Sequence, residues 1–125
     1  MNLKNYKPSE AELEILQILW EKGSCTVREV HEILELNKET GYTTTLKQMQ
    51  VMHEKGLLSR DVSSKTHIYK AEAEKEQVQQ EILDKMIDTV YNGSAARLVM
   101  QALGNHTASK EEIEAIQKYL TQLNK

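Results

Sequence analysis

Hydrophobic residues recur at helical spacing near the start of the chain, and capping residues mark where the helices begin. Residues 9–12 form a capping box, in which a serine and a glutamate three positions apart satisfy backbone N–H groups at a helix start. The apolar stripe that follows ends at Gly23, a residue typical of helix C-termini. A second capping box at 26–29 predicts a short helix that ends in the polar segment 37–41.

The stretch from about 41 to 55 predicts a third helix with one apolar and one polar side. At 100° per residue, the apolar side consists of Tyr42, Thr45, Leu46, Met49, Met52 and His53. The opposite side is rich in side chains that can form hydrogen bonds, and it has no acidic residue before Glu54. It consists of Thr43, Thr44, Lys47, Gln48 and Val51. Two strand-like segments follow at 57–62 and 66–71, joined by residues 63–65. Three short helices and a two-stranded hairpin are the element order of a winged helix-turn-helix.

The second half of the chain is predicted to form three amphipathic helices and no strands. A helix of about four to five turns follows Glu72 and is broken at residues 92–93. Ser94 then caps a short helix that should end at Gly104, and a third capping box at 109–112 opens the last helix. The apolar residues of this last helix are spaced by three and four positions, as in a seam between two helices.

These three helices are too few to bury their apolar sides against one another, because so short a segment rarely supplies an adequate core. A second copy of the chain would supply the missing surface. The residues predicted to form the dimer are Val78, Ile82, Met86, Leu98, Leu103, Ile113, Ile116, Leu120 and Leu123. We therefore predict a mainly α protein, with a winged helix-turn-helix of three helices and a small β-hairpin over 1–71 and a three-helix dimerisation domain over 72–125.

Composition narrows the class of protein. The 125 residues are 39% hydrophobic and 28% charged, a balance typical of a globular chain. No apolar run approaches the roughly 18–20 residues of a membrane span, and no secretory signal is expected. The single cysteine forms no intrachain disulfide, so a cytoplasmic protein is expected. The net charge is −3, but residues 38–70 hold six basic and three acidic side chains, which suits contact with a polyanion.

The polar side of the third helix has the chemistry to read DNA in the major groove. Threonine offers a hydroxyl and a methyl group, glutamine pairs with adenine, and lysine reaches guanine or phosphate. Side chains early in the helix should reach deepest, in the order Thr43, Thr44, Lys47, then Gln48, with Val51 as an apolar contact. The residues predicted to contact the DNA backbone, from a wing at about 62–66 and from two neighbouring elements, are Ser63, Ser64, Lys65, Arg28 and Arg60.

Other interpretations of the same surface stay open. The polar side of a helix is most often only solvated. A winged-helix module that binds proteins, or a ligand-sensing repressor with a pocket between its C-terminal helices, would fit the same element order. No catalytic arrangement, phosphate loop or cofactor motif is recognised, so neither an enzyme nor a cofactor is expected.

Two further positions have chemistry that could suggest a sensor. His31 and Glu35 have a spacing that binds metals, but without a third ligand they are expected to be surface residues. Cys25 precedes a helix start, where a thiolate is favoured and redox sensing is conceivable. A small buried turn residue is the favoured interpretation of Cys25, because cysteine is so often buried.

Most of the chain resembles the penicillinase and methicillin-resistance repressor family (BlaI/MecI type). The matching segments are AELEILQILWEKG (11–23), TVREVHEIL (26–34), GYTTTLKQMQVMHEKGLLSRD (41–61), HIYKA (67–71), GSAARLVMQAL (93–103) and SKEEIEAIQKYL (109–120). The more specific marks are the Leu-Trp of the first helix, the Tyr-Thr-Thr that opens the third and the Lys-Gly that ends it. The resemblance implies a homodimeric winged-helix repressor that acts on a palindromic DNA operator.

Departures from the family's pattern limit what the resemblance implies. The family often has basic residues where Leu46 and Val51 stand and a threonine where Lys47 stands, so the operator sequence does not carry over. Antibiotic-responsive members are cut by a metalloprotease at an Asn-Phe bond, and this chain has Gln101 and Ala102 there. Copper-responsive members carry Cys-x-Cys motifs, which this sequence lacks. The resemblance therefore leaves the inducing signal open.

Overall fold

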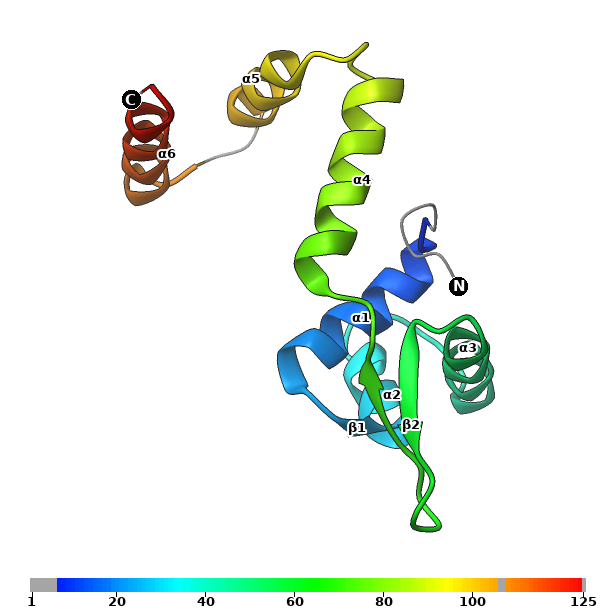
Figure 1. Ribbon diagram of the computed structural model, residues 1–125. Coiled ribbons are helices and arrows are strands. Elements are labelled where there is room, and N and C mark those ends of the chain that lie inside the picture. Colours follow the sequence, from blue (N-terminus) through cyan, green and yellow to red (C-terminus); the bar gives the residue numbers. More distant parts are fainter. Residues whose placement is uncertain (1–6, 106–107, 125) are drawn as a thin grey trace. The chain divides into compact units, whose positions relative to one another are not determined.

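Six helices and three short strands make up the computed structural model, which describes residues 7–105 and 108–124 (Figure 1). In chain order the elements are α1 (Glu10–Lys22), β1 (Cys25–Thr26), α2 (Val27–Glu35), α3 (Tyr42–Glu54), β2 (Leu58–Asp61), β3 (Ile68–Ala71), α4 (Lys75–Thr89), α5 (Ala95–Asn105) and α6 (Lys110–Leu123). Their internal contacts divide the chain into two units, residues 1–82 and 83–125. Within the described residues, no helix combines the length and the apolar content needed to cross a membrane.

The predicted capping boxes are present at the starts of three helices. In each box a hydroxyl accepts a hydrogen bond from the backbone N–H three residues on, and a glutamate accepts one from the N-cap N–H. The pairs are Ser9 and Glu12 for α1, Thr26 and Glu29 for α2, and Ser109 and Glu112 for α6. A cap of this kind stabilises a helix by about 0.5–2 kcal/mol. At its other end α1 stops at Gly23, whose positive φ of 87° costs a glycine little.

The core of the first unit collects the apolar sides of α1, α2 and α3 against the sheet. The buried hydrophobic side chains are Ile15, Leu16, Leu19, Cys25, Val27, Val30, Leu34, Met49, Met52, Leu57, Leu58, Tyr69 and Ala73. Those on the three helices belong to the sides that the helical spacing predicts to be apolar. Since burying one large aliphatic side chain contributes about 1.5–3 kcal/mol, this core is the main source of stability in the unit.

The sheet has one strand more than the sequence predicts. Its order is β1-β3-β2 with antiparallel neighbours, so that Cys25 lies opposite Tyr69 and Leu58 lies opposite Ala71 (Figure 1). The missed strand β1 is only two residues long, too short for any alternation of apolar and polar residues to reveal it. Its pairing with β3 ties the connection between α1 and α2 to the hairpin, and so holds the hairpin beside the helices.

None of the described residues of α4, α5 and α6 is buried. The break between α4 and α5 lies where the sequence predicts it, at Asn92 and Gly93, which both have positive φ. The prediction that Gly104 ends the next helix is wrong, because α5 runs through it to Asn105. A glycine inside a helix costs only about 1 kcal/mol, which the neighbouring helix-forming residues offset.

The first unit extends further along the chain than the winged helix predicted over 1–71. Ala73 is buried, and the backbone N–H groups of Glu72 and Ala73 both donate to the carbonyl oxygen of Leu57, at 2.8 and 3.2 Å. Val78 packs against the same core from the second turn of α4. The beginning of α4 is therefore part of the first unit.

Replacing a core leucine should test how far this unit depends on its packing. Leu16→Ala is expected to lower the free energy of unfolding by about 2–5 kcal/mol, because Leu16 has no exposed area and its loss leaves a cavity. The matched control is Leu36→Ala, since Leu36 is 80% exposed and its truncation should change stability by less than about 0.5 kcal/mol. Chemical denaturation of both variants measures the difference. Equal losses would contradict the assigned core.

Candidate nucleic-acid interface

The rotation of α3 about its axis is fixed by its buried side. Thr45, Met49 and Met52 have no exposed area. The opposite side of the helix consequently faces outward, with Thr43, Thr44 and Lys47 exposed and Gln48 and Val51 partly exposed. All five side chains predicted to read DNA are thus accessible on one side of one helix. Their contact with bases remains a prediction.

The N-terminus of α3 is left without the cap that other helices of the chain have. Gly41 at the N-cap provides no side-chain hydrogen bond, and the first turn contains no acidic residue. The N–H groups of a first helical turn carry a partial positive charge that favours anions. In α1, α2 and α6 a hydroxyl and a glutamate occupy the corresponding positions. The positive end of α3 is therefore available to an anionic partner.

A row of side chains joins the N-terminal parts of α2 and α3. The guanidinium of Arg28 lies 4.9 Å from the ring centroid of Tyr42. The ring of His31 meets the same tyrosine in a T-shaped arrangement at 5.5 Å. On its other sides His31 has Nδ1 at 3.2 Å from the Thr45 hydroxyl and Nε2 at 3.1 Å from the Glu35 carboxylate. These contacts hold Arg28 against Tyr42 at the N-terminus of α3, a contact that the sequence does not predict because it places Tyr42 only on the apolar side of the helix.

The position of His31 corrects the prediction that it lies at the surface. Only 6% of the residue is exposed, because it shares the buried side of α2 with Val27, Val30 and Leu34. The signal was present in the sequence, since His31 follows Val27 by four positions, but a histidine is not counted as apolar. In the part of the chain that the structure describes, no group of three His, Cys, Asp or Glu side chains could hold a metal.

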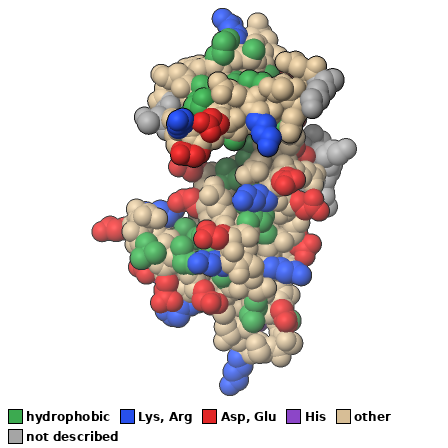
Figure 2. Space-filling view, turned by 90° about the vertical axis from the view of Figure 1, so that its left-hand side faces the viewer, with side chains coloured by type: hydrophobic (Ala, Val, Ile, Leu, Met, Phe, Trp, Pro, Cys, Tyr) green, Lys and Arg blue, Asp and Glu red, His purple; other side chains and the backbone are tan. Residues whose placement is uncertain are grey.

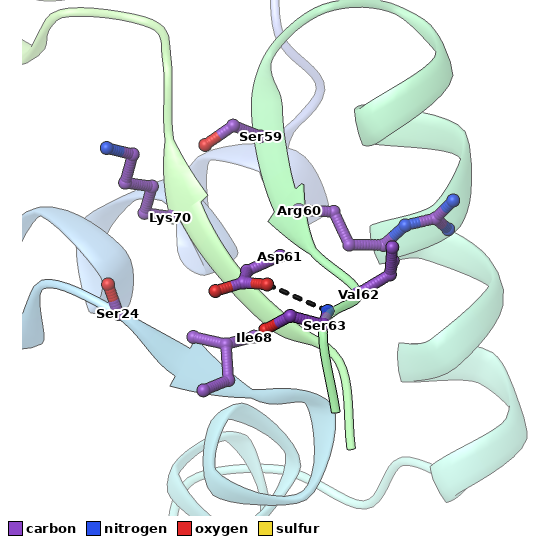
Figure 3. A pocket seen from close by; sticks show the side chains of 8 residues that line it. All are labelled: Ser24, Ser59, Arg60, Asp61, Val62, Ser63, Ile68 and Lys70. Atoms are coloured by element: carbon purple, nitrogen blue, oxygen red, sulfur yellow. Dashed lines mark hydrogen bonds between the residues drawn. The ribbon is translucent and has the colours of Figure 1, made fainter. Parts of the chain in front are cut away.

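Local hydrogen bonds shape the tip of the hairpin between β2 and β3. The carboxylate of Asp61 accepts a hydrogen bond from the backbone N–H of Ser63 at 2.9 Å (Figure 3). Hydrogen bonds from Ser63 lower the pKa of Asp61 below its ordinary value of 3.8, so the carboxylate stays ionised and the turn stays tied at neutral pH. The hydroxyl of Ser64 donates to the carbonyl of Thr66 at 2.9 Å. The tip is thus an ordered turn with Lys65 exposed on it.

Arg60 has a different environment from the exposed wing residues. It lies opposite Tyr69 in the sheet, and Figure 3 shows its side chain directed from β2 toward α3, away from Asp61 and Lys70. The residue is half-buried, and its Nε atom is buried without a hydrogen-bond partner in the described chain. The side chain therefore packs partly beside α3 instead of extending freely into solvent. Its predicted contact with the DNA backbone would have to come from its terminal nitrogens.

A groove of about 430 Å³ lies between α2, α3 and the hairpin. It brings Arg28 of α2 together with Lys65 and His67 of the hairpin, and Tyr42 and Gln50 of α3 also line it. None of the described residues that line this groove is acidic. A groove with basic walls attracts phosphate even when the whole molecule has a net negative charge, as this one does.

Cys25 is a buried residue of β1, as the favoured interpretation predicts. It is 3% exposed. Burial raises the pKa of its thiol above the ordinary value of 9.0, and the Glu29 carboxylate raises it further against a smaller opposite effect of Lys22. The thiol therefore stays protonated at neutral pH, and the structure gives no support to redox sensing at this residue.

Three helices followed by a hairpin, with the third helix presenting a hydrogen-bonding side, define the chain as a winged helix-turn-helix protein. The sequence model of the family described as penicillinase repressor matches residues 8–122. The chain belongs to this family, whose members are regulatory repressors and not enzymes.

The chain is also similar to individual family members over nearly its whole length. It is 25% identical to the methicillin resistance regulatory protein MecI of Staphylococcus aureus (strain N315), over 98% of this chain and 99% of that protein. It is 25% identical to the penicillinase repressor of Bacillus licheniformis, over 91% of this chain and 89% of that protein. Among solved structures, a MarR family protein from Bacillus stearothermophilus matches with a TM-score of 0.53 and 21% identity, covering 98% of this chain and 76% of that one. The similarity to the MarR family protein concerns the fold alone.

Thiol chemistry provides a direct check on the environment of Cys25. Because the folded state raises its pKa and buries the sulfur, alkylation of the native protein at pH 7–8 should be at least about tenfold slower than that of the unfolded chain. Iodoacetamide labelling followed by mass spectrometry, with and without denaturant, measures the ratio. Equal rates would contradict the buried position.

Proposed function

We propose that the protein is a transcriptional repressor that binds a palindromic DNA operator as a homodimer, with α3 in the major groove. The observation that carries the proposal is the accessible hydrogen-bonding side of α3, which lies next to an uncapped helix N-terminus. Threonine, lysine and glutamine side chains on that side can address base edges and phosphates. The family relationship supports the proposal, since the similar proteins are a methicillin resistance regulator and penicillinase repressors.

The groove between α3 and the hairpin is well suited to one strand of the DNA backbone. When a recognition helix occupies the major groove, a neighbouring wing reaches the adjacent backbone or minor groove, and phosphates pass between the two elements. Arg28 and Lys65 line the groove from two different elements, without an acidic neighbour among its lining residues. The uncapped N-terminus of α3 lies at Tyr42, which lines the same groove. Contacts of this kind fix the position of α3 before its side chains read sequence.

The second unit supports the dimeric part of the proposal. Large hydrophobic side chains remain exposed on its helices, and they reach its surface in the space-filling view (Figure 2). They are Leu83, Met86, Val90, Val99, Met100, Leu103, Ile113, Tyr119, Leu120 and Leu123. A monomer in water rarely leaves so many large apolar side chains exposed within about forty residues. A second copy of the same chain would cover it, and a symmetric dimer would present two recognition helices to two half-sites.

Selection of genomic fragments bound by the purified protein tests the proposed function. A palindromic site with half-sites about one helical turn apart, or a multiple of it, is the expected result. Affinity for this site should fall steeply with salt concentration, because counterions are released from the phosphates. Retained dimerisation without any DNA binding would refute the proposal and favour a protein-interaction module instead.

Two substitutions on the exposed side of α3 should weaken operator binding. Lys47→Ala is expected to cost about 1–3 kcal/mol through a lost base or phosphate contact, and Thr44→Ala about 0.5–1.5 kcal/mol through a lost hydrogen bond. Fluorescence anisotropy with labelled operator measures both. The matched control is Lys118→Ala, which removes the same charge from an exposed position of α6 and should leave affinity unchanged. Unchanged binding in both α3 variants, with native circular dichroism, would contradict the choice of reading residues.

A lysine introduced into the proposed seam should separate the chains. Ile116→Lys or Leu120→Lys is expected to raise the dimer dissociation constant roughly 30- to 150-fold, because burying an unpaired charge costs about 2–3 kcal/mol or more. Gln117→Lys introduces the same side chain at an exposed polar position of the same helix and serves as the control. Sedimentation velocity over a range of concentrations measures association. If both seam variants associate as strongly as the wild-type protein, the interface lies elsewhere.

A further inference from the structure

A side-chain hydrogen bond between distant parts of the sequence anchors the beginning of α4. The indole Nε1–H of Trp20, in the last turns of α1, donates to the backbone carbonyl of Ala73 at 2.8 Å. Ala73 is 2% exposed and its own N–H donates to the carbonyl of Leu57. Both backbone polar groups of this residue are therefore held by other elements of the first unit, two residues before α4 begins.

The anchor continues into the helix itself. Val78 and the ring of Trp20 both pack against the core cluster of the first unit. The segment from 72 to 78 is consequently held by two backbone hydrogen bonds to Leu57, the indole hydrogen bond and one apolar contact. All of these contacts lie within residues 1–82, whereas α4 itself runs on without interruption to Thr89.

The indole hydrogen bond matters more for the direction of the α4 axis than for the stability of the first unit. Fixing one end of a rigid helix at several points determines its axis, and α4 has 15 residues, which corresponds to a length of about 22 Å. A tilt of only about 15° at the anchored end would displace the far end by about 6 Å. Apolar packing alone restrains tilt poorly because it has no preferred direction, whereas a hydrogen bond at 2.8 Å does.

We propose that Trp20 is a positioning residue for operator recognition, which fixes the direction of α4 through Ala73 and thereby the half-site spacing that the dimer accepts. The inference rests on the proposed function, in which two recognition helices must meet half-sites about 34–36 Å apart or a multiple of that distance. A rigid link between each recognition helix and its dimer-forming helices selects one spacing sharply. A loosened link accepts several spacings and binds each of them less tightly.

The test uses Trp20→Phe, which keeps a smaller aromatic ring against the core and removes the hydrogen-bond donor. Wild-type protein should bind operators with one or two base pairs inserted between the half-sites at least tenfold more weakly than the selected operator. The variant should discriminate among these spacings by threefold or less and bind the selected operator several-fold more weakly. Its affinity for a single half-site should stay within twofold of wild type. The control is Ile18→Val, on the same helix and packed on the same core but without a hydrogen bond.

A distance measurement that needs no DNA separates this proposal from the function on which it rests. Spin labels at Glu32→Cys on α2 and Asp88→Cys near the end of α4, diluted with unlabelled chain, report the direction of α4 by pulsed electron resonance. The distance distribution should be narrow in wild type and Ile18→Val and clearly broader in Trp20→Phe. Should Trp20→Phe fail to fold, Val78→Ala, which weakens the other contact, is expected to broaden the distribution in the same way. A distribution as narrow as wild type in the folded variant overturns the positioning role, whether or not the protein binds an operator. Absence of DNA binding by the wild-type protein overturns the proposed function, and with it the role in operator recognition, but leaves the anchoring of α4 by Trp20 to be decided by the distance distribution.

Discussion

The burial of one side of α3 is the constraint on which the rest of the winged-helix unit depends. Thr45, Met49 and Met52 have no exposed area, so the helix cannot rotate without exposing the centre of the core. Thr45 is the polar member of this set, and its hydroxyl lies 3.2 Å from a nitrogen of the buried His31. Breaking this contact is costly because the buried Nδ1 atom of His31 would lose its partner, while the Thr45 hydroxyl would keep only its longer hydrogen bond to the Gly41 carbonyl at 3.5 Å. Packing and hydrogen bonding thus fix the same rotation, and the outward side of α3 follows from it.

The distribution of acidic residues reconciles a net charge of −3 with a proposed polyanionic partner. Glutamates complete the capping boxes of three helices and are missing from the first turn of α3. Around α1, the capping glutamate Glu12 also lies 3.1 Å from Lys55, and Glu14 lies 2.9 Å from Lys38. Because ionic screening reduces interactions beyond about 10 Å at 0.1 M salt, a phosphate responds mainly to the nearest charges. The local charge beside α3 therefore matters more than the total.

Features that depend on local chemistry, such as the helices, can be predicted from the sequence. Features that depend on tertiary contacts, such as the short strand β1, cannot. Capping residues and helical spacing predict the helices and the core sides of α1, α2 and α3, apart from the end of α5, because these signals act within a few residues of one another. The two-residue strand β1 exists only through its pairing with β3, and its residues carry no pattern of their own. The sequence predicts His31 at the surface because no third metal ligand accompanies it, and its polarity hides that it shares the apolar spacing of α2. The contact of Tyr42 with Arg28 depends on how α2 packs against α3. The residues of the dimer seam are predicted from helical spacing alone, and they stay a prediction.

The first unit has a core of its own and the second has none among its described residues, so the proposed DNA binding would depend on the association of two chains. The first unit has its own core and presents α3 without help from the rest of the chain. In the second unit no described helical residue is buried, so a partner that covers its apolar side chains would stabilise it by mass action. A single winged helix can contact only one half-site, and the affinity gained from a second half-site requires a linked second copy. A signal that disturbs the second unit would then release DNA without touching the reading side of α3.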